Sequence, residues 1–190
     1  MSNVEPDNQA ARHALHDEWL VVRCQLGERD AFDPLIARWH PALSRYASRV
    51  GGDGDRTGDI VQDIWLRVLR GLPGLRDPSK FRPWLFGIAR RVLMDRLRLR
   101  YSEPRFEDVD TSLLPEPVVD DRHEDLSAME TGLATLPPIE REVLDLFYLQ
   151  ELSLLEIADV TAVPVGTVKS RLHRARHLLR RQLAEKGIRP

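Results

Sequence analysis

The chain has 190 residues, of which 42% are hydrophobic and 31% are charged, and its formal net charge at pH 7 is −2. Its longest apolar runs last four or five residues, which excludes a membrane span of about 20, and its N-terminus lacks the order of a signal peptide. A single cysteine, Cys24, excludes an internal disulfide and a multi-cysteine zinc site. We therefore expect a soluble, reduced, cytoplasmic protein.

The charges are arranged in blocks. Residues 76–100 hold eight basic and two acidic side chains, and residues 164–190 hold eight and one. Between these two basic segments, residues 101–130 hold ten acidic and two basic side chains. The acidic segment also carries three prolines and shows no sustained apolar period. This composition predicts a flexible linker, over 101–127, between two domains.

Before the linker, apolar residues recur at helical spacing in three places. Phe32, Leu35, Ile36 and Trp39 form the first stripe, and Pro41 is expected to kink or end that helix. A second stripe lies over 60–69, and a third helix runs from about 83 to 100 with arginines on its outer face. No window alternates with period two for long enough to predict a sheet. The predicted fold class is therefore all-α, with two small helical domains.

After the linker, a short helix over 139–149 precedes two helices joined by a tight turn. Ser153 begins a capping box with Glu156 three residues later, and residues 161–164 form the turn. The second helix of this pair, over 165–183, has a basic outer face. Two helices arranged in this way are typical of a helix-turn-helix.

The basic helix carries the side chains that a DNA-recognition helix needs. Its first turns present Thr167, Lys169, Ser170, His173 and Arg174, with further arginines at 171, 176, 180 and 181. The alternative is the solvated basic face of an ordinary surface helix. His173 and His177 have a spacing that can bind a metal, but contact with phosphate or a base is preferred, and no metal or cofactor is expected.

The segment 81–100 mixes arginines with aromatic residues, the composition that holds single-stranded nucleic acid by stacking in a positive groove. Its aromatic residues are Phe81, Trp84 and Phe86. The alternative is that Trp84 and Phe86 belong to the core. The sequence contains no glycine-rich phosphate loop and no nucleophile elbow, and its histidines are scattered. We therefore do not expect an enzyme.

Four passages together resemble the extracytoplasmic-function (ECF) sigma factors, the compact two-domain class of the sigma-70 family. They are GERDAFDPLIARWHPAL, DIVQDIWLRVLR, FRPWLFGIARRVLMDRLR and the stretch from LPPIEREVL to RARHLLR. The resemblance implies a sigma factor that binds core RNA polymerase and initiates transcription at a dedicated regulon. It divides the chain into a tail (1–17), region 2 (18–100), the linker (101–127), region 4 (128–183) and a C-terminal tail (184–190).

The resemblance also implies roles for individual residues. The polymerase contact would use Asp59, Gln62, Asp63 and Leu66. The −10 element would be bound and melted by Arg67, Leu75, Arg76, Lys80, Phe81, Trp84, Arg90 and Arg91. The −35 element would be read in its major groove by Lys169, Ser170, His173 and Arg174, with Thr167, Arg171 and Arg176 on its phosphates.

The sequence departs from the family pattern at the start of region 2.2. Residues 56–59 read RTGD where many members carry Asp-Ala-Glu-Asp. We hypothesise that core binding is weakened and that phosphorylation of Thr57 restores it, since a phosphate adds about −1.5 to −2 charges. Alternatively, Asp53, Asp55 and Asp59 supply enough acid and Thr57 is only an N-cap. Arg91, in place of a common Asn, changes the expected base preference.

Two rival functions remain. A helix-turn-helix regulator acting on duplex DNA without polymerase explains residues 136–183 but not residues 59–70. A small nuclease or transferase would need a ligand cluster that the sequence does not show. For regulation, the family resemblance implies an anti-sigma factor, or a kinase acting on Thr57, with no direct membrane insertion.

Overall fold

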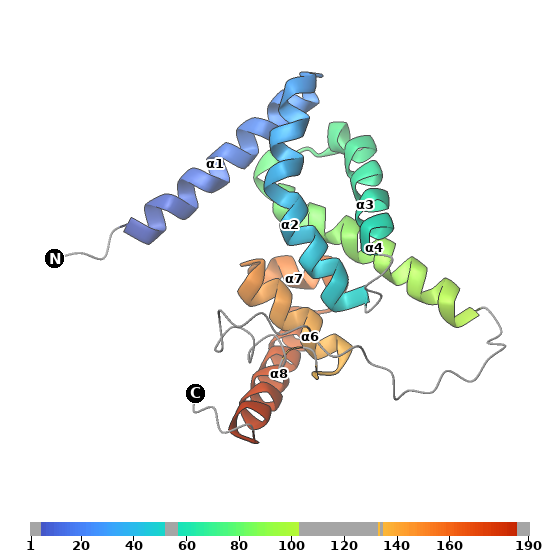
Figure 1. The fold of residues 1–190 in the computed structure, drawn as a ribbon. Coiled ribbons are helices and arrows are strands. Elements are labelled where there is room, and N and C mark those ends of the chain that lie inside the picture. Colours follow the sequence, from blue (N-terminus) through green and yellow to red (C-terminus); the bar gives the residue numbers. More distant parts are fainter. Residues whose placement is uncertain (1–4, 52–56, 103–132, 134, 186–190) are drawn as a thin grey trace, which may run out of the picture.

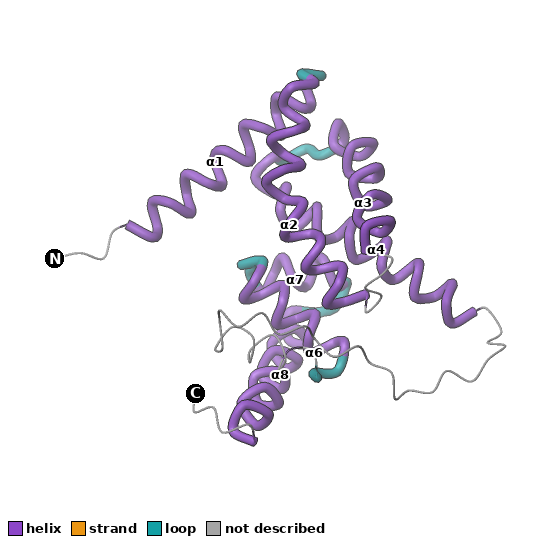
Figure 2. The backbone as a smooth tube through the Cα atoms, viewed as in Figure 1, coloured by secondary structure: helices purple, strands orange, loops and turns teal. Residues whose placement is uncertain are grey.

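The computed structural model describes residues 5–51, 57–102, 133 and 135–185, and every regular element within these ranges is helical (Figures 1 and 2). The predicted all-α fold class is therefore confirmed. The helices are α1 (Glu5–Gln25), α2 (Phe32–Gly51), α3 (Thr57–Gly71), α4 (Phe81–Ser102), α6 (Pro138–Leu144), α7 (Leu154–Thr161) and α8 (Val165–Glu185). Shorter turns are η1 (Arg29–Ala31), η3 (Leu72–Gly74), η4 (Pro78–Lys80) and η5 (Asp145–Leu149). Most of the expected acidic linker lies outside the described residues.

Helices α2, α3 and α4 pack around an aromatic centre. The ring of Trp39 meets Phe81 and Phe86 edge-on, at centroid distances of 6.0 and 6.2 Å, and Tyr46 meets Phe86 at 5.2 Å. Edge-on ring pairs of this kind add about 0.5–1.5 kcal/mol beyond the burial of their apolar area. The stripe that begins at Leu35 and Trp39 thus supplies the buried face of α2, as its spacing predicts.

Helix α2 does not end at Pro41, contrary to one of the two outcomes expected from the sequence. A proline lacks the N–H that would bond to the carbonyl of Ala37, four residues earlier. Both Pro41 and Ala37 are exposed, so water can satisfy that carbonyl. Beyond the proline, the buried stripe continues through Leu43 and Tyr46. Core packing therefore carries the helix on to Gly51.

Helix α1 includes residues that were expected to form an N-terminal tail. It begins at Glu5 and extends from the body of the molecule in Figure 1. Its C-terminal half is attached to the core: Asp17 is buried and pairs with Arg38 of α2. Near its end, Gln25 Nε2 donates a hydrogen bond to the carbonyl of Leu75 at 2.7 Å. These contacts fix the loop that follows α3.

The C-terminal helices contain the predicted helix-turn-helix. Helix α6 continues into η5, a single π-helical turn. Helix α7 begins with the predicted capping box: Ser153 Oγ accepts from the Glu156 N–H at 3.3 Å, and the Ser153 N–H donates to Glu156 Oε2 at 2.9 Å. Ala162, with φ of 54° in the left-handed region, closes the turn before α8.

The N-terminal helices (α1–α4) and the C-terminal helices (α6–α8) contact each other directly. Helix α7 packs against α4, and α6 packs against α2. In Figure 1, α6, α7 and α8 lie below α2 and α4. The buried apolar residues of both sets form one continuous cluster. The two parts of the chain are therefore closed onto each other.

Candidate nucleic-acid interface

One face of α3 is exposed and carries the residues predicted to bind polymerase. Asp59, Gln62 and Leu66 are exposed and Asp63 is half-buried. The residues on the opposite face are buried in the core: Ile60, Val61, Ile64 and Trp65. Leu66 is 46% exposed and places an apolar side chain among polar ones. The structure thus brings the four predicted residues onto a single surface.

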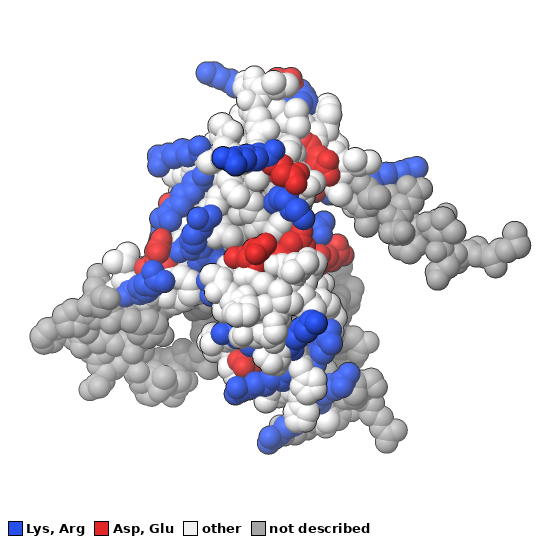
Figure 3. Space-filling view, turned by 180° about the vertical axis from the view of Figure 1, so that it is seen from behind, with Lys and Arg blue, Asp and Glu red and all other residues white. Residues whose placement is uncertain are grey.

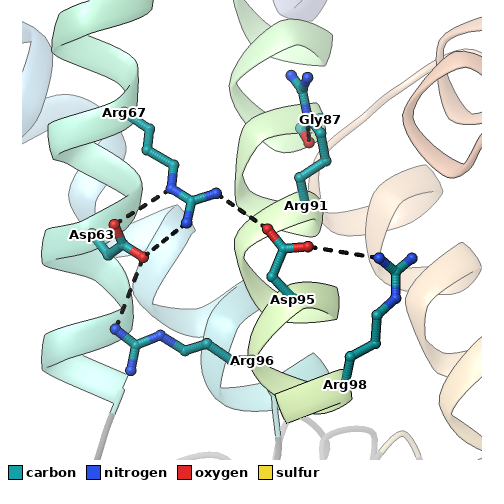
Figure 4. A network of polar contacts seen from close by, with 7 residues as sticks. All are labelled: Asp63, Arg67, Gly87, Arg91, Asp95, Arg96 and Arg98. Carbon is teal, nitrogen blue, oxygen red and sulfur yellow. Dashed lines mark hydrogen bonds and ion pairs between the residues drawn. The ribbon is translucent and has the colours of Figure 1, made fainter.

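A network of ion pairs connects this surface to α4 (Figure 4). Arg67 contacts Asp63 at 3.4 Å and Asp95 at 3.3 Å. Arg96 lies 3.9 Å from Asp63, and Arg98 lies 3.8 Å from Asp95. Exposed pairs of this kind contribute only about 0–1 kcal/mol each, so the network orients Arg67 more than it stabilises the fold.

A hollow of about 580 Å³ lies between the end of α3, the following turn and α4. It is lined by Arg67, Gly71, Gly74, Trp84, Ile88, Arg90, Arg91, Met94, Asp95 and Arg98. At Gly71, an added Cβ atom would lie only 3.1 Å from Trp84 Cζ2, so the absence of a side chain lets the indole approach α3. An indole surrounded by guanidinium groups is suited to a base and its phosphates.

The hollow includes residues that the sequence analysis did not single out. Asp95 and Arg98 line it together with Trp84 and Arg91. These four positions, with Ile88 between them, follow one another at spacings of four, three, four and three residues. That spacing places them on one helix face, so a search for polar residues in register with Trp84 could have found them.

The loop before α4 separates the predicted −10 residues into two groups. Phe81 is 1% exposed and Leu75 is also buried, so both side chains pack in the core under the loop. Neither side chain is accessible to a ligand. Arg76 and Lys80 are exposed. The turn η4 begins at Asp77, whose carboxylate accepts hydrogen bonds from Ser79, and these bonds lower the pKa of Asp77.

Helix α8 presents its predicted base-reading residues to solvent. Lys169, Ser170, His173 and Arg174 are all exposed, and Arg174 lies 3.3 Å from Glu140 of α6. Figure 3 shows Lys and Arg side chains both on the lower part of the molecule and on the upper part, with acidic side chains between them. The structure therefore has two separate basic surfaces.

Arg176, predicted to contact phosphates, is engaged within the fold. Its guanidinium carbon lies 5.4 Å from the ring centroids of both Phe147 and Tyr148 in η5. Its Nε is buried and has no hydrogen-bond partner among the described residues. Cation–π contacts of this kind fasten α8 onto the π-helical turn.

Two of the cations predicted for the −10 element contact the C-terminal helices. Arg90 lies 3.0 Å from Glu142, and Lys80 lies 3.6 Å from Glu156. Sequence analysis missed these pairs, because each joins residues more than fifty positions apart and no local pattern indicates them.

Two family models match the chain. The one described as Sigma-70 region 2 matches residues 35–102, and the one described as Sigma-70, region 4 matches residues 126–179. No helix among the described residues is long and apolar enough to cross a membrane.

Similar proteins extend these matches along most of the chain. The ECF RNA polymerase sigma factor SigW of Bacillus subtilis is 30% identical over 179 residues, which cover 87% of this chain and 95% of SigW. SigC of Mycobacterium tuberculosis, also described as an ECF RNA polymerase sigma factor, is 38% identical over 165 residues, covering 84% and 87%. Among solved structures, the sigma factor RpoE in complex with the anti-sigma factor NepR from Bartonella quintana matches with a TM-score of 0.64 and 25% identity, over 80% of this chain and 96% of that one.

Proposed function

The chain belongs to the ECF RNA polymerase sigma factors of the sigma-70 family, and from this premise we propose which of its surfaces carry out each part of promoter recognition. The observation that supports the proposal best is the hollow beside α3 and α4. There the indole of Trp84 and the guanidinium groups of Arg67, Arg90, Arg91 and Arg98 line one hollow.

The α3 face is our candidate for the contact with core polymerase. Asp59, Gln62 and Asp63 supply polar groups around the exposed Leu66. A protein interface of this kind combines an apolar centre with a polar rim. Because Arg67 contacts Asp63, the same helix connects this surface to the −10 site.

The hollow is our candidate for the melted −10 strand. Trp84 would stack on a base, while Arg67, Arg90 and Arg91 would neutralise phosphates. Stacking of this kind offsets part of the few kcal/mol that it costs to take a base out of the duplex. Phe81 and Leu75, being buried, would act only by holding the loop that carries Arg76 and Lys80.

The first turns of α8 are our candidate for the reader of the −35 duplex. Lys169, Ser170, His173 and Arg174 are exposed on the second helix of the helix-turn-helix, which enters the major groove in this motif. Thr167 and Arg171 are half-buried beside them and lie where phosphate contacts would be made. Arg176 contributes by fixing α8 in place.

Regulation and location follow from the same premise. A similar sigma factor was solved in complex with an anti-sigma factor, and we propose a partner of this class here. The chain would act in the cytoplasm, with core polymerase and promoter DNA, and would perform no covalent chemistry itself.

We propose Thr57 as a second point of control. It is the first residue of α3 and is half-buried. A phosphate there would add negative charge at a helix N-terminus, where anions are favoured, and beside Asp59 on the polymerase surface. The neighbouring charged residues Asp53, Asp55 and Arg56 lie outside the described residues.

Permanganate footprinting tests the proposed function. We expect reactive, unpaired thymines at the −10 position only when promoter DNA, core polymerase and this chain are all present. Protection of duplex DNA by the chain alone, with no opening in the presence of polymerase, would instead support a helix-turn-helix regulator that acts without polymerase.

A further inference from the structure

The closed arrangement contains a buried charge cluster that joins the two parts of the chain. Glu142 of α6 has 6% of its side chain exposed and accepts hydrogen bonds from two residues of the N-terminal helices. Tyr46 Oη donates to Glu142 Oε1 at 3.1 Å, and Arg90 Nε donates to the same oxygen at 3.0 Å. A buried carboxylate needs such partners, because an unpaired charge away from water is strongly destabilising.

A second buried carboxylate lies one helical turn later. Asp145 has 1% of its side chain exposed and forms an ion pair with Arg49 of α2. Gln150 Nε2 donates to Asp145 Oδ1 at 2.8 Å, which fixes the carboxylate from its own side. Arg141 donates to the main-chain carbonyl of Arg49 at 2.9 Å. We call Glu142 and Asp145, with Tyr46, Arg49 and Arg90, the carboxylate clamp.

Weaker contacts surround the clamp. Lys80 lies 3.6 Å from Glu156. Arg82 lies 3.4 Å from Glu151 and from the carbonyl of Gln150. The ion pairs between the two parts share one direction: the cation lies in the N-terminal part and the carboxylate in the C-terminal part. Lys80 and Arg90 are also among the cations that we propose for −10 DNA.

We propose that the carboxylate clamp is an autoinhibitory contact, in which Glu142 occupies Arg90, a cation that the −10 strand needs, and the Arg49–Asp145 pair holds the two parts together. This inference rests on the proposed −10 role of the α4 surface. A carboxylate and a phosphate both bind a guanidinium through anionic oxygens, so Arg90 cannot serve both fully at once. Helix α7 also packs against α4, so the two parts are joined at more than one place.

In the closed arrangement, the free chain cannot bind both promoter elements. The −10 and −35 elements are separate along the promoter, so reading both requires the two sets of helices to separate. Separation exposes Glu142 and Asp145 to water and frees Arg90 for DNA. Core polymerase, by binding the α3 face and holding the two parts apart, would shift the chain from the closed to the open form.

The closed form can be measured in the full chain with a pair of fluorophores. His40 on α2 and Ala184 on α8 are exposed, and a cysteine at each position accepts a label. The native Cys24 is buried, and burial raises the pKa of its thiol to about 11, so it reacts slowly. Energy transfer between the labels reports the separation of the two parts.

The variants are chosen to separate the clamp from a general effect of charge. Glu142→Gln removes one negative charge from the clamp, and Asp159→Asn removes one from an exposed position on α7. Arg49→Glu places like charges together at Asp145, and Arg49→Glu with Asp145→Arg restores an opposite pair. Circular dichroism checks that each variant keeps its helices.

We expect high energy transfer in the native chain and in Asp159→Asn. Transfer should fall in Glu142→Gln and in Arg49→Glu, and it should recover in the double exchange. With a short single-stranded DNA of mixed sequence, Glu142→Gln should bind at least about tenfold more tightly than Asp159→Asn, because the freed Arg90 adds an anion contact.

The two readouts separate the possible failures. Equal energy transfer in all variants would overturn the clamp and leave the −10 assignment intact. Lower transfer without any gain in DNA affinity would overturn the competition at Arg90, and with it the assignment of that residue to −10 DNA. An open chain in Arg49→Glu that the exchange does not close would show that the Arg49–Asp145 pair is not responsible.

Discussion

Arg90 of α4 donates a hydrogen bond to Glu142 of α6 at 3.0 Å, across 52 positions of sequence. This contact joins the helix proposed for the −10 strand to the helix that precedes the −35 reader. Both residues are largely withdrawn from solvent, and a buried pair of this kind is costly to break by removing one partner. The arrangement of the two parts therefore depends on Arg90, a side chain that we also propose for the −10 strand.

Trp84→Ala should weaken the capture of the −10 strand. Stacking of a base on an aromatic side chain is worth about 1–3 kcal/mol, so affinity of the holoenzyme for a −10 single strand should fall by about fivefold to about 150-fold. Trp84→Phe should retain most of the affinity, and Trp19→Ala, at an exposed position on α1, should not change it. Equal binding by Trp84→Ala and the native chain would argue against the hollow as the strand site.

Lys169→Ala should impair DNA binding, whereas Arg176→Ala should impair stability. Loss of one phosphate or base contact at Lys169 should lower duplex affinity and reduce the salt dependence of binding by about one ion. Arg176→Ala should instead lower the melting temperature, because the guanidinium packs on Phe147 and Tyr148. Salt titrations and thermal unfolding of both variants check this division. A reduced salt slope with unchanged stability in Arg176→Ala would assign that residue to DNA after all.

Ser153→Ala should destabilise the helix-turn-helix. The substitution removes the hydrogen bonds that Ser153 Oγ makes with Glu156, while the Ser153 N–H can still donate to the Glu156 carboxylate. Loss of such a side-chain cap costs about 1 kcal/mol of unfolding free energy. Urea denaturation at neutral pH measures the difference. Ser48→Ala, at an exposed position within α2, provides a comparison in which no helix cap is lost.

The capping box also predicts a dependence on pH. Burial raises the pKa of Glu156, but hydrogen bonds from Ser153 and the nearby Lys80 outweigh it, so the pKa lies below the ordinary 4.5. A lowered pKa in the folded state gives stability that is present above the ordinary value and is lost as the pH falls through the folded value. The stability difference between the native chain and Ser153→Ala should therefore shrink below pH 4.5. A difference that stays constant down to that range and below it would contradict this role of Glu156.

Thr57→Asp and Thr57→Ala should differ in transcription if Thr57 is a control point. A carboxylate partly mimics the charge of a phosphate, so Thr57→Asp should bind core polymerase more tightly than Thr57→Ala. Co-elution with core polymerase and transcript yield measure both effects. Equal activity of the two variants would mean that Thr57 only begins the helix.

The sequence predicts the local features of the molecule well, and the reasons are physical. Apolar spacing at Leu35 and Trp39, the Ser153–Glu156 capping box and the helix-turn-helix all depend on residues within a few positions of one another. The extent of α1 was not predicted, because its buried apolar residues, Leu20, Val21 and Cys24, lie only in its last two turns, while Leu15, Trp19 and Val22 face solvent.

The candidate site also combines features that local sequence predicts with features that depend on packing between distant segments. The exposed α3 face and the basic face of α8 follow from helical periodicity alone. The burial of Phe81, the stacking of Arg176 and the pairing of Arg49 with Asp145 depend on packing between distant segments. Residue type identifies an aromatic or a cation as a candidate ligand contact, but only the fold decides whether it reaches a ligand or another part of the chain.

The most direct test of the account is run-off transcription with purified core polymerase and a promoter library, with and without this chain. We expect transcripts only when the chain is present, from promoters that share two spaced elements. Substitutions in the first turns of α8 should alter the upstream element, and substitutions around Trp84 should alter the downstream element. If the chain binds duplex DNA but no transcripts form in its presence, the assignment of promoter recognition to these surfaces is contradicted.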